Sequence, residues 1–274
     1  MDTDILIEKF AKMGARAKLN EPVRRRWGRT QFAAISIDIG QDRKGEFFSV
    51  MMNPERLDEC RVTDVRPAQR HLLLQVDHRD ADEGRQKFLC GHDERHWFVA
   101  AVPEAARASN VQTAMQALKP IAVKAAEARV RLKARDGQRR KNRAFIRQGE
   151  WFFIPCPGVS FNADLIHQRE PLSRGAGSKP HIVDEIVRTG GETVYVSYLH
   201  PTGLTEAERK RWVSRNRAKA RGVRFQAMVR NAGVFARGKV RHADHKTIVL
   251  NGWHEVAMNT ESQSRAMSHV AFLD

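Results

Sequence analysis

The sequence predicts an α+β protein in which antiparallel, β-rich N-terminal and C-terminal parts are joined by a basic helical segment. Runs of β-branched and aromatic residues alternate with turn residues at both ends of the chain. Residues 105–145, between them, are rich in Ala, Lys and Arg. Because 274 residues suffice for more than one domain, we predict an N-terminal α+β domain over 1–104, a helical connector over 105–145 and a C-terminal β-rich domain over 146–274.

The N-terminal part begins with a helical pattern and continues with strand patterns. Apolar residues at helical spacing follow Thr3 and end at Gly14, which predicts a short helix. Residues 15–29 are basic and without a periodic pattern, so we expect them to be irregular. Close polar turns between the later apolar runs favour an antiparallel meander or a small curled sheet. The predicted strands cover residues 32–39, 46–52, 59–65, 70–77, 86–90 and 96–102.

Two helices are predicted in the connector. Ser109 and Gln112 have the spacing of a capping box, which predicts the start of the first helix. Pro120 ends that helix or opens the next, and the Ala-, Lys- and Arg-rich run after it predicts a second helix over 121–143.

The C-terminal part returns to strand patterns. Residues 189–192 contain two adjacent glycines and predict a hairpin turn. The capping box of Thr205 and Glu208 predicts a helix that runs to about Ala220. The predicted strands cover residues 150–155, 182–187, 193–198, 224–229, 234–241, 247–250 and 254–258.

The net charge of +16 comes from two segments of the chain. Residues 121–150 and 205–241 together hold 22 Lys and Arg against five Asp and Glu, whereas the remaining residues sum to −1. Such a concentration predicts a polyanion as partner, nucleic acid above all; the alternative is a solvated face that maintains solubility. The predicted phosphate contacts are Arg139, Arg140, Lys141, Arg143, Arg209, Lys210, Arg211, Arg215, Arg217, Lys219 and Arg221.

Several classes of protein are disfavoured by the sequence. No apolar run approaches the ~20 residues that a membrane helix needs, and the first residues are acidic where a secretory signal is basic. The three cysteines, Cys60, Cys90 and Cys156, are odd in number and widely spaced, unlike a disulfide framework. We therefore expect a cytoplasmic protein with no membrane partner.

Two histidine-containing segments are candidates for chemistry, and the first surrounds a predicted turn. Cys90, His92 and His96 are residue types that bind zinc. The pair His92 and Glu94 resembles half of the zinc deaminase motif. The second cysteine of its Pro-Cys-x-x-Cys half is replaced by Val159. We therefore expect an ordinary turn here and no metal.

The second segment contains His242, His245 and His254, which are the candidate catalytic residues. A histidine can act as a general base or a metal ligand near neutral pH. The sequence His245-x-Thr247 matches one of the two motifs of the 2H phosphoesterases, but we find no second copy. The stretch also resembles the histidine block of Hint domains, whose other motifs we do not find. We expect these histidines to be structural or to contact phosphate, and we predict neither a cofactor nor a metal.

The segments 147–155, 237–242 and 259–261 resemble motifs of an uncharacterised bacterial and phage protein family, mainly over residues 145–274. This resemblance implies a bacterial or mobile-element origin and supplies no mechanism. The charge distribution predicts a non-enzymatic nucleic-acid-binding protein, with DNA and RNA both open as partners. Two alternatives remain: a histidine-centred, metal-dependent hydrolase or nuclease, and a structural or assembly protein of a mobile element that docks an acidic partner.

Overall fold

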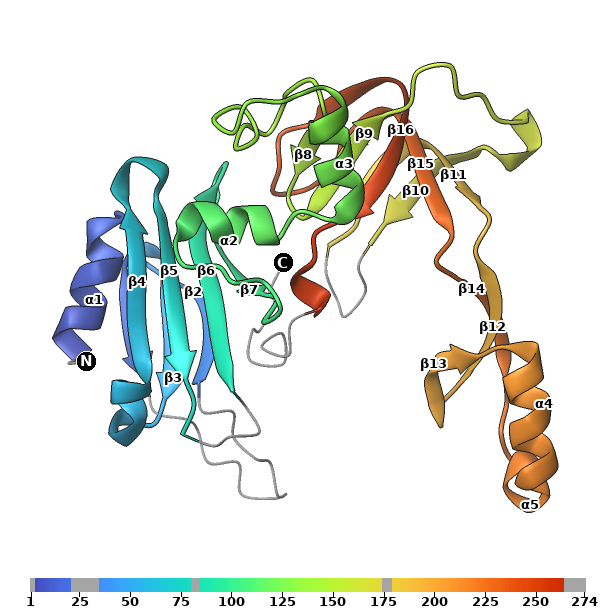
Figure 1. Ribbon diagram of the computed structural model, residues 1–274, viewed down its shortest axis with the longest axis horizontal. Coiled ribbons are helices and arrows are strands. Elements are labelled where there is room, and N and C mark those ends of the chain that lie inside the picture. Colours follow the sequence, from blue (N-terminus) through green and yellow to red (C-terminus); the bar gives the residue numbers. More distant parts are fainter. Residues whose placement is uncertain (1–2, 21–34, 80–83, 174–178, 264–274) are drawn as a thin grey trace.

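A computed structural model of the chain describes residues 3–20, 35–79, 84–173 and 179–263. Strands make up 46% of the structure and helices 23%, and the described strands form four sheets (Figure 1). Because strand residues are about twice as numerous as helical residues, the chain is β-rich overall. The predicted α+β class, in which a helical segment joins two parts, is therefore wrong. None of the described helices has the length and apolar composition needed to cross a bilayer.

The chain opens with a helix and a three-stranded sheet. These elements are α1 (Thr3–Lys12), β1 (Ala17–Asn20), β2 (Ile35–Asp42) and β3 (Gly45–Met52). The short helix is confirmed, and β2 and β3 form an antiparallel hairpin as predicted. Residues 32–34 of the predicted strand lie outside the described residues. β1 pairs in parallel with β3, in a segment where the sequence predicts irregular structure.

A four-stranded antiparallel meander follows and confirms the strands predicted for this region. It consists of β4 (Cys60–Arg66), β5 (His71–Asp77), β6 (Arg85–Asp93) and β7 (His96–Val102). β5 is buried on both faces, which explains its continuous apolar run. Leu72 and Leu74 join a core shared with the three-stranded sheet, whereas Leu73 packs with residues of the helix that follows β7. We call α1 and β1–β7 the N-terminal body.

The connector contains two short helices, α2 (Val111–Ala117) and α3 (Ile121–Arg129). The prediction of one helix over 121–143 is wrong for 130–143, which form turns and bends. The side-chain oxygen of Asn142 accepts a hydrogen bond of 3.1 Å from the backbone N–H of Phe145. The ring of Phe145 is buried and lies 5.2 Å from that of Phe152. Burial of this ring, a tertiary contact, overrides the helical composition of the segment.

The C-terminal sheet has six strands. They are β8 (Ile146–Gln148), β9 (Trp151–Pro155), β10 (His167–Leu172), β11 (His181–Thr189), β15 (Gly233–Arg241) and β16 (Ile248–Met258). Their order is β10-β11-β15-β16-β9-β8, and all neighbours are antiparallel. One core of the sheet includes Phe153, Val183 and Val240, and a second joins Val123 of α3 to Phe152 of β9. Short 3-10 turns cover Pro54–Glu59, Pro67–Gln69, Ala163–Leu165 and Glu261–Gln263.

An arm projects from this sheet, as Figure 1 shows. It consists of β12 (Glu192–Ser197), β13 (His200–Leu204), α4 (Glu206–Arg215), α5 (Arg217–Ala220) and β14 (Gln226–Arg230), and we call residues 192–230 the arm. The predicted hairpin at 189–192 is wrong, because β11 pairs with β15 and β12 pairs with β14. Gly190 and Gly191 instead connect the C-terminal sheet to the arm. A Cβ on Gly191 would lie 2.7 Å from the carbonyl oxygen of Arg230, so glycine is required where these two segments touch.

Candidate functional site

The arm ends in α4, α5 and residues 221–225, which we call the arm tip. The predicted capping box is present: Thr205 and Glu208 each accept a hydrogen bond from the backbone N–H of the other. No residue of α4 or α5 is buried. Two cations, Arg209 and Lys210, pair with Glu206. Six exposed cations have no carboxylate within ion-pair distance among the described residues, namely Arg211, Arg215, Arg217, Lys219, Arg221 and Arg224.

A small aromatic cluster supports the arm tip. The ring of Trp212 in α4 lies 5.0 Å from the ring of His200 and 5.9 Å from that of Phe225. Trp212 therefore packs within the arm. By contrast, Tyr198 at the turn between β12 and β13 is 75% exposed, so its ring faces solvent.

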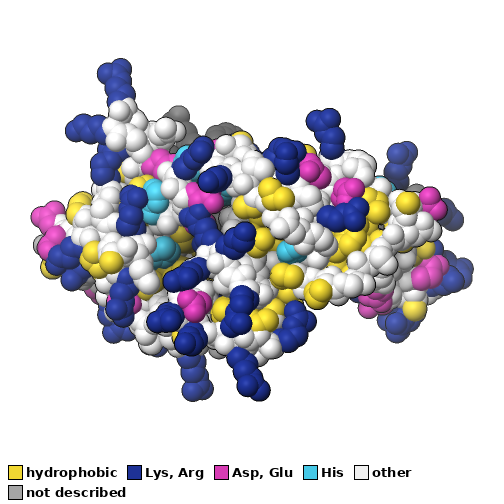
Figure 2. Space-filling view, turned by 90° about the horizontal axis from the view of Figure 1, so that it is seen from above, with side chains coloured by type: hydrophobic (Ala, Val, Ile, Leu, Met, Phe, Trp, Pro, Cys, Tyr) yellow, Lys and Arg dark blue, Asp and Glu magenta, His cyan; other side chains and the backbone are white. Residues whose placement is uncertain are grey.

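The connector cations predicted to contact phosphate differ in their surroundings. Arg140 pairs with both Asp93 and Glu94 at the turn between β6 and β7, so its charge is neutralised within the protein. The other three, Arg139, Lys141 and Arg143, are exposed. Figure 1 places the connector and the arm tip far from each other, and Figure 2 shows Lys and Arg side chains spread over the face seen from above. The connector and the arm tip are therefore two separate basic surfaces.

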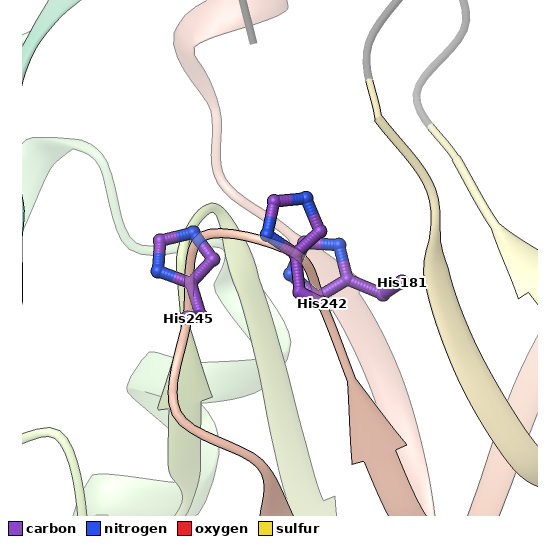
Figure 3. A group of neighbouring side chains, drawn as sticks. All are labelled: His181, His242 and His245. Carbon is purple, nitrogen blue, oxygen red and sulfur yellow. The ribbon is translucent and has the colours of Figure 1, made fainter.

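Two of the three candidate catalytic histidines lie together. Beside them lies another histidine, His181, which the sequence did not indicate as a candidate. His242 and His245 belong to the loop between β15 and β16, and His181 at the start of β11 lies beside them (Figure 3). The pairing of β11 with β15 brings them together, because Ile182 is opposite Arg241. The ring centroids of His181 and His242 are 4.2 Å apart, and those of His242 and His245 are 4.7 Å apart. One nitrogen from each ring lies within 4.8 Å of the other two, and we call these side chains the histidine cluster.

His254, the third predicted candidate, does not belong to the histidine cluster. It lies within β16, opposite Pro155 of β9, and its side chain is buried. Its Nδ1 lies 3.0 Å from the carbonyl oxygen of Gly252. Burial lowers the pKa of His254, which favours a neutral imidazole with a local backbone partner.

His181 is the buried member of the histidine cluster, with 1% of its surface exposed. Neither of its ring nitrogens has a hydrogen-bond partner among the described residues. Burial, and secondarily the neighbouring His242 and His245, lowers the pKa of His181 to about 3, so that the ring is neutral at pH 7. A neutral imidazole has one donor and one acceptor, and each left unpaired in a buried position costs about 1–3 kcal/mol.

His242 is half-buried and held by two long contacts. Its Nε2 lies 3.3 Å from the carbonyl oxygen of Lys179, and its Nδ1 accepts a hydrogen bond of 3.2 Å from the backbone N–H of Asp244. The side chains of Lys179 and Asp244 form an ion pair of 2.8 Å. The ring of His242 is stacked on that of His181, with an angle of 24° between the ring planes (Figure 3).

His245 lies between a carboxylate and a glycine. Its Nδ1 is 3.6 Å from Oε2 of Glu94, which also accepts a hydrogen bond of 2.8 Å from the backbone N–H of Lys246. Arg140 holds the other oxygen of the same carboxylate at 2.5 Å. On the glycine side, a Cβ on Gly149 would lie 3.0 Å from Nε2 of His245 and 3.7 Å from the ring of His181. The turn between β8 and β9 thus approaches the histidine cluster closely.

One member of the histidine cluster, His245, lines a cavity of about 370 Å³ that is bordered by residues of both the N-terminal body and the C-terminal part. His245 and Asp244 line it from the C-terminal part, and Glu46, His96 and Trp97 line it from the body. Because its lining carries both acidic and basic groups, the cavity does not select ligands by net charge alone.

The side chains of the first histidine segment point to separate surroundings. Cys90 is buried in the core of the N-terminal body, where burial raises the pKa of its thiol. The ring of His92 meets the ring of Trp97 edge-on at 4.9 Å, and Nδ1 of His96 is 2.6 Å from the carboxylate of Glu46. The segment forms the turn between β6 and β7 that the sequence predicts.

His181 is the candidate residue that sequence reasoning missed. No motif surrounds it. The sequence shows only that it begins an apolar strand, and the pairing of that strand with β15, which brings His181 to the other two histidines, was not predicted. No family model matches the chain, and no curated protein or solved structure is significantly similar to it. The arm tip and the histidine cluster must therefore be interpreted from their own chemistry.

Proposed function

We propose that the protein is a basic, cytoplasmic protein that binds nucleic acid through the arm tip. One observation carries the proposal: six exposed cations, none paired with a carboxylate of the described residues, lie in the arm tip, which projects from the rest of the chain (Figure 1). Such cations can reach the phosphates of a nucleic acid, and counterion release then favours binding. The three free thiols suit a reducing compartment such as the cytoplasm.

The charge of the arm has one predominant sign. Residues 192–230 contain nine Lys and Arg against three Glu. Ion pairs to Glu206 and Glu192 involve only three of these cations, Arg209, Lys210 and Arg230. Because phosphate contacts position a protein without reading bases, we expect binding to many sequences with little discrimination.

Tyr198 adds a feature that favours unpaired bases. It lies two residues before His200, whose ring contacts Trp212 of α4, so the exposed tyrosine belongs to the same end of the arm. Stacking of a base on an aromatic side chain contributes about 1–3 kcal/mol. We therefore expect single strands to bind at least as tightly as duplexes of the same length.

The test is fluorescence anisotropy with labelled single-stranded and duplex DNA and RNA, over a series of salt concentrations. The test variant replaces Arg217, Lys219 and Arg221 with Gln. If these side chains contact phosphates, the slope of log K against log salt should become less steep by about 2 to 3 for a duplex, because each lost contact removes about 0.9. Affinity should fall for every sequence tested.

A matched control replaces Arg43, Lys44 and Arg107 with Gln. These three cations are exposed and have no ion pair among the described residues, so the control removes the same charge from the N-terminal half. We expect its salt slope to equal that of the wild type. An equal loss in both variants would mean that net charge, not the arm tip, drives binding. Failure of the wild type to bind any probe at low salt would favour the alternative of an acidic protein partner.

A further inference from the structure

We propose that the histidine cluster binds one divalent transition-metal ion, and that Zn²⁺ is the ion that fits it best. The inference is independent of nucleic-acid binding, because the cluster lies at the loop between β15 and β16 and not in the arm. It also departs from the expectation, drawn from the sequence, that the protein holds no metal. Three observations support it: a buried imidazole with no hydrogen-bond partner in the described part of the chain, the closeness of three ring nitrogens, and a carboxylate beside one of the rings.

The buried imidazole is the strongest of these observations. His181 is almost fully buried, and both of its ring nitrogens are without hydrogen-bond partners among the described residues. Buried polar groups in folded proteins are nearly always hydrogen-bonded, and those that are not indicate a strained or functional position. A metal ion would satisfy one of these nitrogens, and the neutral form of the ring is the one that binds metals.

The positions of the three rings are close to what a metal ion requires. Zn–N bonds of 2.0–2.1 Å in tetrahedral geometry place the ligand nitrogens about 3.3 Å apart. The cluster nitrogens already lie within 4.8 Å of one another. His242 and His245 are on a loop, and the two contacts of His242 are long, at 3.2 and 3.3 Å. Release of one of these contacts, with rotation of the stacked rings, draws the nitrogens inward.

The surroundings of His242 and His245 indicate which nitrogen of each would face the ion. A metal-bound histidine usually donates its other N–H to a carboxylate or a backbone carbonyl, which fixes the ring. Glu94 lies beside Nδ1 of His245, and the carbonyl of Lys179 lies beside Nε2 of His242. With these partners kept, His245 binds through Nε2 and His242 through Nδ1. Gly149 leaves room at Nε2 of His245, where any other side chain would place its Cβ at 3.0 Å.

The ligand set determines the class of metal. Imidazole nitrogens suit Zn²⁺, Cu²⁺, Ni²⁺ and Co²⁺, whereas Mg²⁺ and Ca²⁺ require oxygen ligands. Three protein ligands leave a fourth coordination position for water, as in zinc sites that perform chemistry. Of the three ligands, His245 lines the cavity, so the cavity is the side from which a small molecule would approach that position.

The experiment uses the full-length protein, freed of metal by a chelator. Zn²⁺ is titrated in competition with a chromogenic chelator, and Co²⁺ is added separately to record the visible absorption of a tetrahedral site. We expect one Zn²⁺ per chain, and at least tenfold weaker binding in each of His242→Ala and His245→Ala. The matched control is His167→Ala, which removes an exposed histidine from β10 and should leave affinity unchanged.

Thermal unfolding of each variant separates loss of the ligand from loss of the fold. If His242→Ala unfolds at a lower temperature than the wild type, His242→Gln replaces it in the comparison, because glutamine keeps a polar side chain at the site. The proposal is overturned if the wild type binds no stoichiometric Zn²⁺, or if a variant lacking both His242 and His245 binds Zn²⁺ as tightly as the wild type.

Discussion

In the N-terminal body, two sheets and α1 close around Phe10, Phe48 and Phe88, none of which has exposed surface. In the arm, three strands and two helices bury Val194 but no residue of either helix. A helix of ten residues and a small sheet are only marginally stable without a core, so the arm depends on its attachment to the C-terminal sheet. The arm therefore contributes little to the core, and its helices leave their side chains available to a partner.

The largest expected effect is that of Phe88→Ala in the body. Truncation of a fully buried phenylalanine destabilises a protein by about 3–5 kcal/mol. Cys60 and Cys90 share this core, and burial raises the pKa of the Cys60 thiol to about 12, so both thiols should react slowly in the native wild type. We expect Phe88→Ala to lower the free energy of unfolding and to accelerate thiol labelling at both cysteines.

Trp212→Ala in the arm provides the contrast. It removes the centre of the aromatic cluster but no part of the body, so we expect the arm tip to lose helical structure while the labelling rates of Cys60 and Cys90 stay unchanged. Equal acceleration of labelling in the two variants would show that the arm and the body unfold as one unit.

A smaller effect is expected at the junction between the C-terminal sheet and the arm. Gly191→Ala places a Cβ 2.7 Å from the carbonyl oxygen of Arg230, at a residue with φ of +85°. Backbone strain of this kind costs about 1–3 kcal/mol. Hydrogen exchange of the β12 and β14 amides should therefore become faster, while exchange in the body stays the same.

Gly190→Ala is the matched control for that contact. Gly190 also has a positive φ, at +69°, but its Cβ would meet nothing within 4 Å. Gly190→Ala therefore introduces backbone strain without the contact to Arg230, so we expect a smaller acceleration of hydrogen exchange than in Gly191→Ala. Identical rates in the two variants would remove the contact with Arg230 from the explanation.

The smallest expected effects come from two capping boxes, one in each half of the molecule. Asn110 caps α2 together with Thr113, one residue later than the sequence predicts, and Thr205 caps α4. Loss of such a cap costs about 1 kcal/mol. Because α2 packs on the meander, Asn110→Ala should lower the global free energy of unfolding by that amount. Thr205→Ala should change only hydrogen exchange within α4, and a global shift as large as that of Asn110→Ala would contradict the comparison.

The body was largely predictable because its signals are local. Short turns separate the apolar runs of β4–β7, and neighbours in sequence are neighbours in the sheet. β1 escaped prediction because residues 17–20 carry no apolar run and form a strand only through parallel pairing with β3. The prediction of a helix over 130–143 is wrong for a similar reason. The composition of this segment is helical, but burial of Phe145 holds the backbone in turns.

The histidine cluster shows the same limit at a functional site. Their closeness in the sequence made His242, His245 and His254 candidates together. His254, however, lies within β16 opposite Pro155 of β9, away from the other two. His181 joins the cluster only through the register of β11 with β15. The two glycines between β11 and β12 have positive φ, as the predicted turn requires, but glycine does not specify which strand will pair with which.

Thr189 at the end of β11 and Gly233 at the start of β15 are directly opposite each other in the ladder. Both ends of the arm therefore leave the C-terminal sheet at a single point, and the arm is an insertion between two paired residues. Because its two ends meet at one rung of the ladder, a longer or shorter arm would leave the strand order of the sheet unaltered. The histidine cluster lies at the other end of β11 and β15, so a change in the arm would leave its geometry in place.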